Sequence, residues 1–177
     1  MTDHHPHLSE LQRKRCFAPV VDADTKLLVL GSLPGEQSLA LQQYYGNRQN
    51  RFWALMSVVL GSELVPLGYV ERLAALQARG VGLWDVVAEA RRSGSLDSQI
   101  RAPAGNDLVA LVQQLPQLRA LAFNGATAAR LGGKLLGAGA QGFEMLALPS
   151  SSPAHTMAFA DKLATWMRLR AYVREAG

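Results

Sequence analysis

The chain has 177 residues, of which 49% are apolar and 18% charged. This length and composition fit one globular domain with a substantial core and exclude a disordered tail or a fibrous repeat. The single cysteine, Cys16, excludes an intramolecular disulfide and a cysteine-ligated zinc site, and no apolar run is long enough to span a bilayer. The net charge of +4 includes 14 arginines and only 4 lysines. Arginine suits phosphate recognition, although an arginine excess fits a GC-rich genome equally well.

The first 25 residues are expected to form a flexible or peripheral segment. They contain His4, His5 and His7 and a basic run at 13–15. Histidines near a chain end belong more often to a solvated tail than to a metal site, so we expect no metal. The lack of a signal peptide and of thiol pairs indicates a reducing, cytoplasmic compartment.

From residue 26 onward, short apolar runs alternate with amphipathic segments. The run 26–31 ends in glycine and is typical of a strand buried on both faces. This alternation predicts one α/β domain over 26–177, a three-layer α/β/α sandwich with a central four-stranded, mainly parallel sheet. The predicted strands are 26–31, 81–85, 118–123 and 144–148, and the predicted helices are 37–43, 53–60, 70–78, 107–115, one that begins at 126–131, and 157–173.

Polar or glycine-rich residues follow each predicted strand, where parallel sheets bind ligands. The segment 31–35 (Gly-Ser-Leu-Pro-Gly) is by itself a tight turn, since it lacks the residues of a phosphate loop, a dinucleotide fingerprint or a nucleophile elbow. Asp85 ends the second strand. A carboxylate at this position could cap a helix or pair with Arg91 or Arg92.

The segment 44–53 (Tyr-Tyr-Gly-Asn-Arg-Gln-Asn-Arg-Phe-Trp) interleaves aromatic, amide and arginine side chains without periodicity. Aromatic rings stack on bases and arginines bind phosphates, so this mixture suits a nucleotide. We expect residues 52–53 to anchor the following helix, and Tyr45 and Asn50 to be exposed for function.

The segment 148–156 (Leu-Pro-Ser-Ser-Ser-Pro-Ala-His-Thr) lies just before the last predicted helix. Its hydroxyls and backbone amides near a helix N-terminus predict a donor-rich mouth for phosphate. A simple connector rich in serine and proline is the alternative. His155 at this place more often caps a helix or meets phosphate than catalyses.

In this order, the segments 31–35, 44–53 and 148–154 resemble the uracil-DNA glycosylase superfamily, above all its hypoxanthine-DNA glycosylase and mismatch-specific uracil or thymine branches. The resemblance covers about residues 26–173. It implies a DNA repair enzyme that flips a deaminated base, hypoxanthine first, out of double-stranded DNA and hydrolyses its N-glycosidic bond without a metal or organic cofactor. We also expect a monomer without membrane association, in a bacterial-type cytoplasm close to the nucleoid.

The resemblance also implies roles for individual residues. It implies that Asp85 accepts a proton from the base, a role that the helix cap or the ion pair with Arg91 or Arg92 would equally replace. Leu33 and Leu148 depart from the uracil-removing branches, which place polar residues there, and both match the hypoxanthine branch. They leave open a DNA- or nucleotide-binding module of the same fold without glycosylase activity. A serine hydrolase is disfavoured because no elbow positions a serine. The expected catalytic residues are Asn50, Ser32 and Asp85. The expected base-binding residues are Leu33, Pro34, Gly35, Tyr45 and Asn124. The expected DNA-binding residues are Arg48, Arg51, Ser150, Ser151, Ser152, Pro153, Ala154 and His155, and the last three of these are candidates to fill the gap that the extruded base leaves in the DNA.

Overall fold

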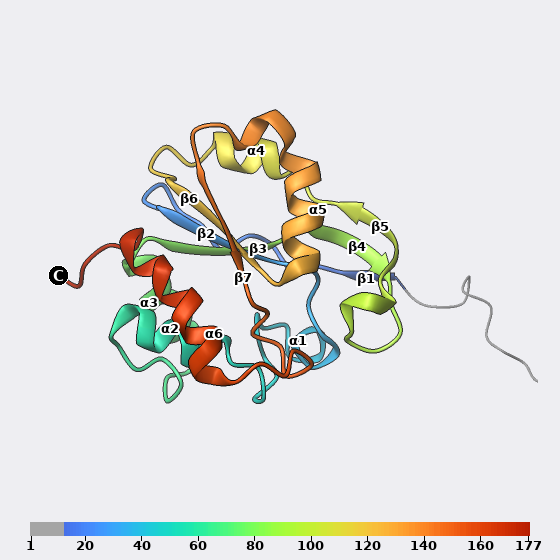
Figure 1. Ribbon diagram of the computed structural model, residues 1–177, viewed down its shortest axis with the longest axis horizontal. Coiled ribbons are helices and arrows are strands. Elements are labelled where there is room, and N and C mark those ends of the chain that lie inside the picture. Colours follow the sequence, from blue (N-terminus) through green and yellow to red (C-terminus); the bar gives the residue numbers. More distant parts are fainter. Residues whose placement is uncertain (1–12) are drawn as a thin grey trace, which may run out of the picture.

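A four-stranded parallel sheet lies at the centre of the computed structural model, which describes residues 13–177 (Figure 1). The strand order is β3-β2-β6-β7, and each neighbouring pair is parallel. The predicted α/β class and central sheet are therefore confirmed. The strands of this sheet are β2 (Leu27–Gly31), β3 (Val81–Asp85), β6 (Ala120–Asn124) and β7 (Glu144–Leu148).

Helices cover both faces of the sheet, because strand β2 is apolar on both sides. Leu27 and Val29 pack in one core cluster with α2 and α6, whereas Leu28 and Leu30 pack in a second cluster with α4 and α5. Figure 1 shows α2, α3 and α6 on one side of the sheet and α4 and α5 on the other. The helices are α1 (Glu36–Leu41), α2 (Phe52–Leu60), α3 (Tyr69–Ala78), α4 (Leu108–Gln113), α5 (Ala126–Leu136) and α6 (Phe159–Trp166), with short 3-10 helices η2 (Asp97–Gln99), η3 (Gly137–Ala140) and η4 (Met167–Ala171).

A second, three-stranded antiparallel sheet was not predicted. Its strands are β1 (Arg13–Arg15), β4 (Val87–Arg91) and β5 (Arg101–Gly105), in the order β1-β4-β5. β1 consists only of basic residues, and β5 contains Pro103 and is exposed along its whole length. Edge strands of this kind tolerate proline and bury little apolar surface, so they leave no hydrophobic pattern in the sequence.

Residues 13–25, which the sequence placed in a flexible or peripheral segment, run along the domain. β1 pairs with β4, Val20 forms an antiparallel bridge with Leu83, and Thr25 is buried. Backbone hydrogen bonds therefore join this stretch to both sheets. His4, His5 and His7 lie outside the described residues.

The last predicted helix, over 157–173, is shorter in the structure. α6 begins at Phe159 and ends at Trp166, and the chain continues as η4. Across residues 13–177, no helix has the length and apolar character needed to cross a membrane.

Candidate active site

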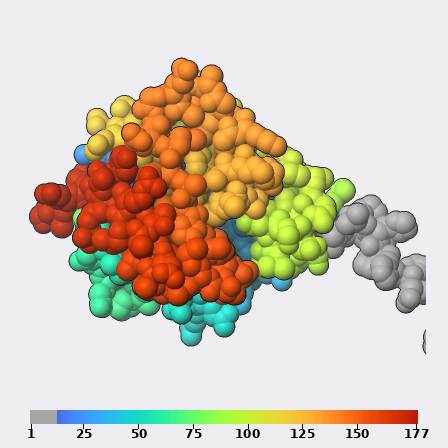
Figure 2. Space-filling view, viewed as in Figure 1, coloured from blue at the N-terminus to red at the C-terminus, as the bar shows by residue number. Residues whose placement is uncertain are grey.

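A cavity of about 360 Å³ lies at the carboxyl ends of the parallel strands. Ligands of open α/β sheets bind at this edge, and the volume is within the usual range for small-molecule sites. Figure 2 shows a hollow between the yellow-green segment that links β4 to β5 and the orange-red segment after β7, with blue residues at its floor. Ser32, Asn50, Asp85 and Ser152, from four separate segments, all line the cavity.

Most of the residues that the sequence predicted for the site line this one cavity, whereas Arg48 and Arg51 do not. Arg48 is exposed. The backbone N–H of Arg51 donates to the Ser151 carbonyl at 2.9 Å, and its guanidinium lies 5.9 Å from the centre of the Phe159 ring. The predicted residues that line the cavity are Ser32, Leu33, Pro34, Gly35, Tyr45, Asn50, Asp85, Asn124, Ser150, Ser151, Ser152, Pro153, Ala154 and His155.

Asp85 is the most unusual group in the cavity. It is 4% exposed, and its Oδ2 atom has no hydrogen-bond partner among the described residues. Burial raises the pKa of the Asp85 carboxyl to about 7, and the neighbouring Asp97 adds to the increase, while Arg92 opposes it. Asp85 caps no helix and forms no ion pair with Arg91 or Arg92 within residues 13–177. The carboxyl is thus held partly neutral near pH 7 and can donate a hydrogen bond into the cavity.

Gly31, at the end of β2, leaves the room that the Asp85 carboxyl occupies. A Cβ atom at position 31 would lie 2.6 Å from Asp85 Oδ1 and 3.2 Å from the Tyr45 hydroxyl oxygen. Glycine is therefore required here for close approach, since any side chain would displace the carboxyl.

The loop 31–35, called the first loop below, is held by residues from the segment after β4. The Ser32 hydroxyl donates to Asp97 Oδ1 at 2.6 Å. Arg92 is almost fully buried and donates to the carbonyls of Leu33, Pro34 and Gly94. Burial raises the pKa of Asp97, and the Ser32 hydrogen bond and Arg92 counteract this increase. Arg92 thus joins the first loop to the opposite cavity wall.

Tyr45 and Asn50 are fixed by the start of helix α2. The Tyr45 ring stacks on Phe52 with 3.9 Å between centroids, and its backbone adopts the left-handed conformation at φ 54°. Asn50 Oδ1 accepts a hydrogen bond from the Phe52 N–H at 2.9 Å. This bond orients the Asn50 side chain and leaves its NH₂ group as the donor for the cavity. Phe52 and Trp53 are buried anchors of α2, as predicted.

Asn124 holds the segment 150–155, called the serine loop below. Its Oδ1 accepts from the Ser151 N–H at 2.9 Å, and its Nδ2 donates to Ser151 Oγ at 2.9 Å and to the Tyr45 hydroxyl at 3.3 Å. Both amide hydrogens are therefore engaged within the protein. Asn124 was predicted to bind the base, and this geometry favours a positioning role instead.

The serine loop is less rich in free donors than the sequence predicted. The backbone N–H groups of Ser152 and Ala154 donate to the hydroxyls of Ser150 and Ser152, and α6 begins several residues later, at Phe159. The buried Lys162 ammonium donates to the Ser152 carbonyl at 3.1 Å, and this hydrogen bond joins the serine loop to α6. The residues 153–155 are exposed at its tip.

One known protein family matches the part of the chain that contains both loops. The model described as the uracil DNA glycosylase superfamily matches residues 18–174. The chain belongs to this superfamily. The predicted resemblance is therefore confirmed, and the match spans both loops, the intervening aromatic segment and the second sheet from Val87 onward.

Two superfamily relatives are hypoxanthine DNA glycosylases of Methanosarcina. The protein from Methanosarcina acetivorans is 39% identical over 153 residues, covering 86% of this chain and 95% of the relative. The protein from Methanosarcina barkeri is 36% identical over 154 residues, covering 87% and 96%. Both relatives are archaeal, so they give no support to the bacterial type expected from the sequence.

A solved superfamily structure has the same architecture. The solution NMR structure of a Methanosarcina acetivorans protein assigned as a uracil DNA glycosylase superposes with a TM-score of 0.80 at 38% identity. The comparison covers 90% of this chain and 97% of the other. The predicted fold family is confirmed.

Several cavity residues of this superfamily member were not predicted. Asp97 lines the cavity, whereas Arg92, in the same segment, is not part of the lining and holds the first loop. The sequence of this segment shows no periodicity, and only the contacts with the first loop reveal both roles. Gly31 was noted as part of a turn, but its close approach to Asp85 depends on the register of β2 and β3. Within the described residues, no three His, Cys, Asp or Glu side chains gather closely enough to hold a metal ion.

Proposed function

We propose that the protein is a DNA glycosylase that removes a deaminated base, hypoxanthine above all, from double-stranded DNA and leaves an abasic site. The observation that carries the proposal is the convergence of four segments, with the partner-free Asp85 carboxyl, on one cavity. The two hypoxanthine DNA glycosylases, similar over nearly their full length, support hypoxanthine as the base.

The cavity takes a single extruded base. Extrusion costs a few kcal/mol and least at a mismatch or lesion, so the weak pairing of a deaminated base favours its entry. Tyr45, fixed on Phe52 and exposed to the cavity, is the proposed stacking platform. We propose that the enzyme acts as a monomer.

Asp85 contacts the departing base. The sequence suggested that an ionised carboxylate accepts a base proton, whereas burial favours the neutral acid, which donates. Negative charge develops on the purine as the bond to the sugar breaks, and a hydrogen-bond donor at that point stabilises it. A buried acid kept neutral to donate to an anion is an established arrangement. We therefore assign Asp85 as the donor to the base.

Asn50 orients the attacking water or the base. Cleavage of an N-glycosidic bond develops positive charge on the sugar, as glycoside hydrolysis does, so the water must be held at the anomeric carbon. Asn50 presents its NH₂ group to the cavity while its oxygen binds α2. Loss of one such donor typically costs about 3 to 4 kcal/mol. Ser32 holds Asp97 and thereby shapes the first loop beside it.

Exposed residues around the cavity bind the DNA. Pro153, Ala154 and His155 lie at the tip of the serine loop and can fill the gap left by the base. Arg48 and Arg51 lie outside the cavity, in keeping with contacts to phosphates rather than to the base. A binding module without catalysis is the second candidate, because the buried Leu33 lines the cavity where a polar side chain would orient water.

Duplexes carrying hypoxanthine, xanthine, uracil or thymine opposite guanine test the proposal when incubation is followed by alkaline cleavage of abasic sites. We expect strand cleavage at hypoxanthine, with the other bases cleaved more slowly. Binding of all duplexes without cleavage of any would contradict the glycosylase and favour the binding module.

A further inference from the structure

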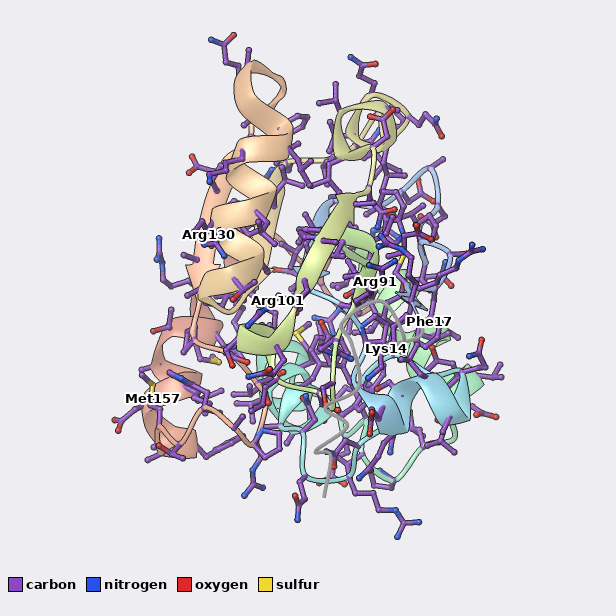
Figure 3. All side chains as sticks on the ribbon, turned by 90° about the vertical axis from the view of Figure 1, so that its right-hand side faces the viewer. Lys14, Phe17, Arg91, Arg101, Arg130 and Met157 are labelled. Carbon is purple, nitrogen blue, oxygen red and sulfur yellow. The ribbon has the colours of Figure 1, made fainter. Side chains whose placement is uncertain are left out.

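Three arginines form a row across the second sheet. Arg13 lies opposite Arg91 on the neighbouring strand, and Arg91 lies opposite Arg101 on the next. Directly opposite residues of an antiparallel sheet project from the same face, so the three guanidinium groups share one surface. Figure 3 labels Arg91 and Arg101 on this surface, with Arg130 of α5 beyond Arg101. Arg13, Arg91 and Arg101 are called the arginine row below.

The positive charge of this row is only partly neutralised within the described chain. Like charges directly opposite one another destabilise a sheet. Glu89 is the one acidic residue on this face of β1, β4 and β5, and it pairs with Arg13 at 2.9 Å and Arg15 at 3.1 Å. Within residues 13–177, the Arg91 guanidinium has neither a hydrogen-bond nor an ion-pair partner. A sheet face with four arginines and one glutamate fits an anionic partner.

The row borders the cavity. Arg91 ends β4 and Arg101 begins β5, so they flank the segment 92–100, from which Ser95, Leu96 and Asp97 line the cavity. In Figure 2 this yellow-green segment forms one side of the hollow. Arg51, whose N–H binds Ser151, belongs to the opposite side, beside the serine loop.

We propose that the arginine row binds the sugar-phosphate backbone of duplex DNA on the side of the cavity away from Arg51. The proposal rests on the proposed function and extends it to a surface outside the cavity. Strands lie about 4.8 Å apart, so the row spans roughly 10 Å. A row of this width is long enough to contact more than one phosphate of the backbone. The arginine fork suits phosphate oxygens.

The test measures binding of an undamaged duplex by fluorescence anisotropy over a series of salt concentrations. Each phosphate contact contributes about 0.9 to the slope of log K against log salt, so Arg91→Ala with Arg101→Ala should reduce the slope by about 2. Arg91→Lys with Arg101→Lys keeps the charges and should retain most of the slope. Arg13 is left unchanged because it binds Glu89 and the Ala102 carbonyl.

Arg168→Ala is the control, since Arg168 is an exposed arginine of η4, the deep-red segment on the far side of the molecule from β5 in Figure 1. If the folded double alanine variant has the same salt slope as the parent, and the parent excises hypoxanthine, the arginine row does not bind the DNA backbone. The proposed function would then remain in place. If the parent protein excises no base, the proposed function is contradicted instead. The salt slopes would still show whether the arginine row binds the DNA backbone.

Discussion

Replacement of Asp85 by asparagine should make the stability of the protein less dependent on pH. The pKa of the carboxyl is raised from an ordinary 3.8 to about 7 by burial. Between these values the unfolded chain is ionised while the folded chain holds the proton. The folded state therefore loses stability as pH rises through this range and reaches the full penalty above about pH 7.

The magnitude follows from the two pKa values. From about pH 5 to about pH 8, ionisation of Asp85 should lower the free energy of unfolding by about 2.5 kcal/mol, since each pKa unit corresponds to about 1.4 kcal/mol. Asparagine has the same shape and does not titrate. The difference in stability between Asp85→Asn and the parent should therefore shift by about 2.5 kcal/mol in favour of the variant over this range.

Urea denaturation at several pH values between these limits measures this difference. Asp107→Asn, at the exposed N-cap of α4, controls for the exchange of a carboxylate for an amide. A stability difference between Asp85→Asn and the parent that stays constant with pH would refute the reasoning, because the carboxyl would then have the same pKa in both states.

The same geometry makes three predictions for excision of hypoxanthine. The single-turnover rate should fall as pH rises through about 7, as Asp85 loses its proton, and Asp85→Asn should remove this dependence; a rate that rises with pH would favour the acceptor role. Asn50→Ala should slow excision about 100- to 1,000-fold, whereas an unchanged rate would exclude Asn50 as the orienting donor. Gly31→Ala should displace the Asp85 carboxyl and slow excision while binding of undamaged duplex persists; equal loss of both would point to general misfolding.

The sequence predicted the parallel sheet well because its strands are short apolar runs that are followed by polar or glycine-rich residues. The strand 144–148 and the strand 81–85 match β7 and β3. The parallel arrangement then places Ser32, Asp85 and Asn124 at one edge without further information, since all their strands run in the same direction.

The sequence could not predict features that depend on contacts between distant segments. The charged edge strand β1 has no apolar pattern, so the second sheet and its arginine row were missed. Asn124 hydrogen-bonds to Ser151, 27 positions away along the chain, so its contact with the serine loop could not be predicted from the sequence. Arg92 was considered a partner for Asp85, and only the fold shows that it binds the carbonyls of the first loop.

Release of free hypoxanthine is the most direct test that the cavity is where a base is cut from DNA. Mass spectrometry of a reaction with a hypoxanthine-containing duplex should detect free base and abasic sites in equal amounts. The combined variant Asp85→Ala with Asn50→Ala should release base at least about 100-fold more slowly, and the surface variant Asp107→Ala should match the parent. Two results would contradict cleavage of the base in this cavity. One is that folded parent protein binds the duplex but releases no free base, and the other is that the combined variant releases base as fast as the parent.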